Sequence, residues 1–137
     1  MLKLGAGKTT VLLWSQMHGD ESTATMAIMD MLKFFSQQPE HIITRSILDK
    51  LNLLIIPMLN PDGAEQFQRR TAQSIDVNRD ALALRTPEAR ILKETRDTYR
   101  PQFGFNLHDQ DPRYSVGETR NVSAIALLAP AFDESRS

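Results

Sequence analysis

The sequence predicts an α/β fold: a doubly wound sheet, mixed in direction but mostly parallel, with helices on both faces. Short apolar segments typical of buried strands alternate with segments whose apolar residues recur every three or four positions, as in amphipathic helices. Strand, helix, strand, helix, strand is the order of such a sheet. Polar residues follow three strands, at His18, Asn60 and His108, and ligand sites in these sheets lie beyond the carboxyl ends of the strands.

The first half of the chain supplies two strands and two helices in this prediction. Residues 10–16 are short, apolar and bounded by turn signals, as expected of a buried strand. Residues 21–37 are predicted to form a helix, and a shorter helical piece is expected at residues 46–50. Residues 51–58 are almost continuously apolar, which fits a strand covered on both faces. The apolar stripe of the long helix consists of Ala24, Ala27, Ile28, Met31, Leu32 and Phe35.

The second half begins with a turn signal, Asn-Pro-Asp-Gly at residues 60–63. Residues 64–85 are polar and have no clear period, so we expect them to be mostly loop. A helix is predicted at residues 86–99, because a capping threonine, a proline and a glutamate stand in order at its start and a proline follows its end. Two more strands are predicted, at residues 103–107 and 122–128.

The composition fits a single globular domain and excludes several functional classes. A chain of 137 residues with 41% apolar and 24% charged residues can bury a core. The formal net charge of −1 leaves no basic excess of the kind that nucleic-acid binding needs. No segment approaches the roughly 18 apolar residues of a membrane helix. The chain has no cysteine and therefore no disulfide or thiolate ligand.

The glycine-rich segment at residues 3–10 is not a phosphate-binding loop. Such a loop needs a glycine five positions before its Gly-Lys pair, and that position is Leu2 here. The segment also leads into a predicted strand, whereas a phosphate-binding loop opens a helix. A turn before a strand is the better interpretation.

A metal site is predicted from three residues at strand ends. His18 and Glu21 are three residues apart at the end of the first strand, so both side chains can turn toward one point. His108 ends another apolar strand. Two histidines and one carboxylate are the ligand set of a catalytic zinc site with an open fourth position.

Four motifs in order give the chain a specific resemblance. His18-x-x-Glu21 is followed by Asn-Pro-Asp-Gly at residues 60–63, by Asp-Val-Asn-Arg at residues 76–79, and by His108 after an apolar strand. This arrangement resembles the zinc metallocarboxypeptidase family, the relatives of carboxypeptidase A, and implies their fold. The motifs lie within residues 16–110, which is most of the chain.

The resemblance implies a role for each matching residue. His18, Glu21 and His108 match the ligands of one Zn²⁺ per chain. Asp76 matches the carboxylate that accepts a hydrogen bond from the first histidine ligand and fixes its tautomer.

The resemblance also implies how substrate is held. Asn78 and Arg79 match the pair that binds the terminal carboxylate of a peptide or protein, and a guanidinium fork suits a carboxylate. One of Arg69 and Arg70 matches the arginine that polarises the scissile carbonyl and stabilises its developing oxyanion. The sequence leaves the choice between these two arginines open.

The implied reaction is metal-assisted hydrolysis of a C-terminal peptide bond. Zinc lowers the pKa of its bound water toward about 7 and polarises the carbonyl. A glutamate acts as general base and then passes the proton to the leaving amine.

The chain departs from the family pattern in several ways. The general-base glutamate of the family lies many tens of residues beyond the last histidine ligand, and neither Glu118 nor Glu134 has the expected context. We therefore expect residues 1–137 to be a single truncated domain that carries the metal-binding half and is catalytically weak or dead. Many secreted members also have an arginine between the first two ligands, where this chain has Gly19-Asp20.

Two alternative functions use the same residues. A zinc deacylase resembling succinylglutamate desuccinylase or aspartoacylase also has His-x-x-Glu and a later histidine, although the motifs at residues 60–63 and 76–79 favour the peptidase. Hydrolysis of a C-terminal peptide compared with an N-acyl amino acid separates the two. A non-catalytic zinc-binding or peptide-binding pseudo-peptidase is motivated by the missing base, and a glutamate further downstream would exclude it.

Overall fold

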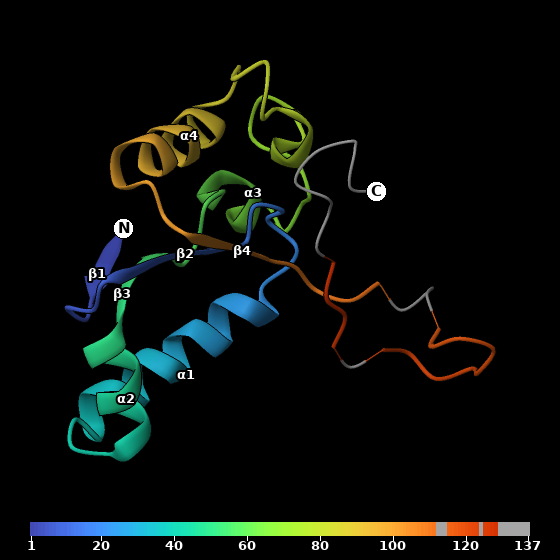
Figure 1. Ribbon diagram of the computed structural model, residues 1–137. Helices are drawn as coiled ribbons and strands as arrows, with labels where there is room; N and C mark the ends of the chain where they lie inside the picture. Colours follow the sequence, from blue (N-terminus) through green and yellow to red (C-terminus); the bar gives the residue numbers. More distant parts are fainter. Residues whose placement is uncertain (112–114, 124, 129–137) are drawn as a thin grey trace, which may run out of the picture.

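A sheet of four strands forms the middle layer of the molecule: β1 (Leu2–Leu4), β2 (Thr9–Ser15), β3 (Leu51–Ile56) and β4 (Phe103–Leu107). Their order in the sheet is β1-β3-β2-β4. The computed structural model describes residues 1–111, 115–123 and 125–128 (Figure 1). β2 pairs in parallel with β3 on one side and with β4 on the other, and β1 pairs antiparallel with β3. The predicted sheet, mixed but mostly parallel, is therefore confirmed.

Helices cover both faces of the sheet, as the sequence predicts. Figure 1 shows α1 (Thr23–Gln37) and α2 (Ile42–Lys50), in blue and cyan, on one side of the strands. The short α3 (Pro61–Glu65) and the longer α4 (Pro87–Tyr99), in green and gold, lie on the other side. In the described part of the chain, no helix is both long and apolar enough to cross a membrane.

Two apolar cores lie on opposite sides of the sheet, and β3 contributes to both. Leu53 and Ile55 belong to the core beneath α1, whereas Leu54 and Ile56 belong to the core on the α4 side. Side chains alternate between the two faces along a strand, so a strand buried on both faces needs apolar residues at every position. This explains the continuous apolar segment that predicts β3.

Several element boundaries differ from the sequence prediction by one or two residues, as in β2, β3 and α1. Two larger differences arise where a capping residue starts a helix. α2 begins at Ile42, earlier than predicted, because His41 Nδ1 accepts a hydrogen bond of 3.2 Å from the Ile43 amide. The predicted turn at residues 60–63 is instead the start of α3. Asn60 caps it by accepting from the Gly63 amide at 2.9 Å, and Pro61 occupies its first turn.

The predicted strand at residues 122–128 is wrong for the residues that the structure describes. Val122 makes one isolated antiparallel bridge to Ser115, and residues 125–128 have no strand structure. Ile125 and Leu128 are 81% and 93% exposed. Apolar residues favour a strand only when a neighbouring strand accepts their backbone hydrogen bonds, and no sheet partner covers these residues here. Ala124 lies outside the described residues.

A buried aspartate joins the loop before α4 to the helix itself. The 3₁₀ turn η1 (Val77–Arg79) ends at Asp80, whose side chain is fully buried. Asp80 accepts hydrogen bonds from the Thr86 amide at 2.7 Å, the Thr86 hydroxyl at 2.9 Å and Arg85 Nε at 3.1 Å. Thr86 in turn caps α4 by accepting from the Ala89 amide at 3.2 Å, which confirms the predicted helix start.

These contacts predict a specific loss of stability in acid. Burial alone would raise the pKa of Asp80, but the hydrogen bonds from Thr86 and Arg85 lower it from 3.8 to about 2. Because the folded state binds fewer protons than the unfolded state, this contribution is complete above pH 3.8 and is lost as the pH falls toward 2. Asp80→Asn should therefore lower the urea midpoint at pH 7 and flatten its decline between pH 4 and pH 2.

The matched control is Asp97→Asn on the exposed face of α4. The pKa of Asp97 is also lowered, by hydrogen bonds from Lys93 and Arg96, but these partners are exposed and salt screens them. Urea midpoints measured across this pH range should change much less in this variant. Equal slopes for wild type and Asp80→Asn would contradict the assignment.

Candidate metal centre

The loop that carries His18 leaves the end of β2 through a tight and well-supported turn. Gln16 has a left-handed backbone with φ of 51°, and its side-chain amide donates to the Gly19 carbonyl at 2.8 Å. This turn directs His18 into the interior, where only 2% of the residue is exposed. The first ligand of the predicted zinc site is thus held by a local hydrogen bond and by burial.

The segment after β3 supports the same loop from behind. The Asn60 amide donates to the Gln16 carbonyl at 3.1 Å, and the Asn60 side chain donates to the Met17 carbonyl at 3.4 Å. Gly19 packs directly on Gly63, since a Cβ added at Gly19 would lie 2.0 Å from the Gly63 carbonyl carbon. The Asn-Pro-Asp-Gly motif therefore supports the His18 loop, a contribution that the turn signal alone does not indicate.

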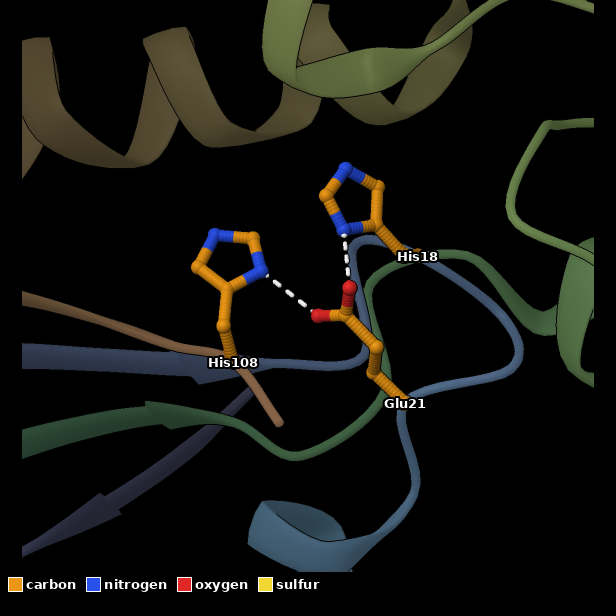
Figure 2. Close-up of side chains that lie close together, drawn as sticks. All are labelled: His18, Glu21 and His108. Carbon is orange, nitrogen blue, oxygen red and sulfur yellow. Dashed lines mark hydrogen bonds and ion pairs between the residues drawn. The ribbon is translucent and has the colours of Figure 1, made fainter. Parts of the chain in front are cut away.

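His18, Glu21 and His108, which we call the ligand triad, converge at the ends of β2 and β4. Figure 2 shows the Glu21 carboxylate between the two imidazoles. Glu21 Oε1 lies 2.7 Å from His18 Nδ1, and Glu21 Oε2 lies 2.6 Å from His108 Nδ1. The ring centroids are 4.8 Å apart, and one ligand atom from each residue lies within 4.8 Å of the others.

The environment of the triad keeps its carboxylate ionised. Burial alone would raise the pKa of Glu21, but hydrogen bonds to His108 and His18, with their charges, lower it to about 2. Metal binding requires a deprotonated carboxylate. Glu21 is therefore in its ligand form across the neutral range.

Asp76 lies behind His18 and joins the triad to the following loop. His18 Nε2 lies 3.2 Å from Asp76 Oδ1, so the imidazole can donate a hydrogen bond to this carboxylate, as the outer nitrogen of a histidine ligand usually does. The same oxygen accepts from the Asn78 amide at 2.9 Å. Burial alone would raise the pKa of Asp76, but the charge and hydrogen bond of Arg69 lower it.

The two candidate arginines lie in different places. Arg69 Nε donates to Asp76 Oδ2 at 3.0 Å, and Arg69 Nη1 lies 3.2 Å from His18 Nδ1 and 3.5 Å from Glu21 Oε1. Arg70 Nη1 instead donates to the Ser74 carbonyl at 2.9 Å, within its own loop. Only Arg69, of the two, contacts the ligand triad in the described structure.

Asn78 and Arg79 lie in the η1 turn directly after Asp76, and the structure does not bring them onto the triad. Asn78 is half-buried and Arg79 is exposed. Within the described residues, no hydrogen bond or ion pair joins either side chain to His18, Glu21 or His108. Their backbone is nevertheless fixed at both ends, by Asp76 before the turn and by buried Asp80 after it.

The chemistry of the triad fits a zinc ion. Two imidazole nitrogens and one carboxylate leave a fourth tetrahedral position open, as in catalytic zinc sites. The remaining nitrogen of His18 has the carboxylate partner that such histidine ligands usually have. The side chains therefore supply both a ligand set and a support for it.

Comparison with known proteins gives a consistent assignment. The sequence matches the zinc carboxypeptidase family over residues 3–126. Carboxypeptidase 2 of Trichophyton rubrum is 29% identical over 126 residues, which cover 90% of this chain and 23% of that protein. Carboxypeptidase 2 of Trichophyton tonsurans is 27% identical over 131 residues, or 94% of this chain and 24% of that protein. The chain thus spans about a quarter of the length of these relatives.

Solved structures share the fold. A metallo-carboxypeptidase from Burkholderia cenocepacia matches with a TM-score of 0.69 and 24% identity, over 77% of this chain and 31% of that one. The murein-tripeptide amidase MpaA from Escherichia coli O157 matches with a TM-score of 0.55 and 18% identity, over 82% of this chain and 57% of that one. Because the family match covers most of the sequence and includes every residue of the ligand triad, this chain belongs to the zinc carboxypeptidase family.

Proposed function

We propose that this chain carries the zinc-binding half of a metallocarboxypeptidase that hydrolyses C-terminal peptide bonds. The observation that supports this most strongly is the convergence of His18, Glu21 and His108 from two strand ends, in a chain of the zinc carboxypeptidase family. The substrate would be the C-terminus of a peptide or protein. The deacylase and the pseudo-peptidase receive no comparable support.

The ligand triad would hold one Zn²⁺ per chain. When bound, such an ion supplies an activated water near neutral pH and polarises the scissile carbonyl. The residues of this chain prepare the site for it, because Glu21 is ionised and Asp76 orients His18 through Nε2.

Arg69 is the arginine that we assign to the developing oxyanion. Its guanidinium lies beside His18 and Glu21 and is held in place by the Asp76 carboxylate. Arg70 donates a hydrogen bond to the Ser74 carbonyl within its own loop, and this contact favours a structural role. Asn78 and Arg79 would bind the terminal carboxylate from a turn that Asp76 and Asp80 hold rigid.

The general base of this reaction would come from outside residues 1–137. Glu118, which lies after His108, is in an exposed turn, and Glu134 lies outside the described residues. Glu21 belongs to the ligand triad and is ionised by its histidine contacts. The metal-binding and base functions would therefore belong to different parts of a longer protein.

Zinc analysis tests the proposal directly. The wild-type chain should retain about one zinc after dialysis against a weak chelator, because two nitrogens and a carboxylate form a complete ligand set. His108→Ala should lose it. The chain has three histidines, and His41→Ala, which changes the one at the start of α2, should keep the metal. A folded wild-type chain without zinc, or His108→Ala with wild-type stoichiometry, would contradict the proposal.

Peptidase activity tests the division of the active site. Purified residues 1–137 loaded with zinc should hydrolyse a C-terminal peptide substrate only weakly, because Glu21, itself a ligand, is the one glutamate of the described residues that contacts the triad. The release of free amino acid would be compared with that of a zinc-free sample. Robust zinc-dependent hydrolysis by this chain alone would refute the expectation.

The choice between the arginines has a separate test in the longer protein that we propose. Arg69→Gln should lower kcat by roughly 10²–10³-fold, the usual effect of removing one oxyanion donor. Arg70→Gln, the adjacent control, should stay within a few-fold of wild type. Steady-state kinetics on one peptide substrate would measure both, and the opposite ranking would assign the role to Arg70.

A further inference from the structure

The residue after His108 ties the end of β4 to the start of α1. Asp109 Oδ1 accepts from the Thr23 amide at 3.2 Å, and Asp109 Oδ2 lies 3.4 Å from the same nitrogen. The Thr23 hydroxyl donates to Oδ2 at 2.9 Å. One carboxylate thus accepts hydrogen bonds from both the amide and the hydroxyl of Thr23, the first residue of α1.

Helix α1 has no cap or acidic residue of its own. Ser22 stands at the cap position but makes no side-chain capping hydrogen bond, and the first turn contains no aspartate or glutamate. The first amides of a helix need partners from outside it, and its amino end favours negative charge. Asp109 supplies both, from a position 86 residues further along the chain.

Both partners of this contact adjoin the ligand triad. Thr23 is two residues after Glu21, and Asp109 is the next residue after His108. β4 ends at Leu107, and the pair formed by Ser15 and Leu107 is the last in its register with β2. His108 therefore lies between two fixed points of the chain. The pairing of Leu107 with β2 holds the backbone before it, and the contact of Asp109 with Thr23 holds the backbone after it.

We infer that Asp109 is a positioning residue that holds His108 against Glu21 in the geometry that a metal ion requires. This inference rests on the proposed zinc site. Without the contact, the backbone at His108 would have to be ordered when the metal binds, which weakens affinity. Residues that orient a ligand without touching the metal usually change its affinity by 10–100-fold.

Zinc dissociation constants of the whole chain, measured by competition with a chromophoric chelator, test the inference. Asp109→Ala should weaken zinc binding by about tenfold. Asp109→Asn, whose amide oxygen still accepts from Thr23, should restore most of that loss. Thr23→Val, a change at an exposed position, removes one of the donors and should fall between wild type and Asp109→Ala. Combining it with Asp109→Ala should add little.

The control separates positioning from simple capping. His41→Ala removes the cap of α2 and should leave zinc affinity unchanged. If Asp109→Ala and Thr23→Val are folded by circular dichroism and bind zinc as tightly as wild type, the inference is overturned while the zinc site stands. If Asp109→Ala does not fold, Thr23→Val decides: zinc binding as tight as that of wild type overturns the inference. A folded wild-type chain that binds no zinc overturns the proposed site, and this inference with it.

Discussion

The parallel pairing of β2 with β4 is the constraint on which the candidate metal centre depends. Their register ends at Ser15 and Leu107, so the residues that follow leave the sheet at the same edge. His18 and His108, far apart in sequence, are thereby brought to ring centroids 4.8 Å apart. A shift of one residue in this pairing would turn every side chain of β4 to the opposite face and would separate the two imidazoles.

The pairing of β2 with β4 does not by itself hold His18 in place, and the segment after β3 supports the His18 loop as well. The segments after β2 and β3 continue side by side, because the Leu59 amide donates to the Ser15 carbonyl at 3.0 Å. The backbones then approach so closely that no side chain fits at Gly19. β2, β3 and the segments that follow them thus support His18 on one side. Asp76, in the loop before η1, contacts His18 on the other side.

The sequence predicts most of this architecture because burial leaves a clear pattern. The strands predicted at residues 10–16, 51–58 and 103–107 are confirmed with small shifts at their ends, and the first two owe their apolar composition to burial between the helix layers. The predicted strand at residues 122–128 fails for the described residues because apolar composition does not report whether a pairing partner exists. β1 escapes prediction because three residues are too few to show a period.

Individual side chains at the centre are harder to predict than strands. The ligand triad follows from residue type and position at strand ends. The choice between Arg69 and Arg70 does not, because it depends on the path of an irregular loop whose residues Phe67 and Ser74 have left-handed backbones. The contact between Asp109 and Thr23 likewise cannot be predicted from the sequence, since local patterns identify a cap only when it lies beside its own helix.

The position of β4 has a consequence for how the protein loses its structure. Within the described residues, β4 has one strand neighbour, β2, and its Phe103 and Phe105 are 57% and 47% exposed. Local opening begins where buried contacts are few and backbone hydrogen bonds are open to solvent. Of the two strands that lead to the candidate metal centre, β4 is therefore expected to open before β2, which is paired on both sides. The two histidines thus belong to regions of unequal local stability, and the centre opens from the His108 side.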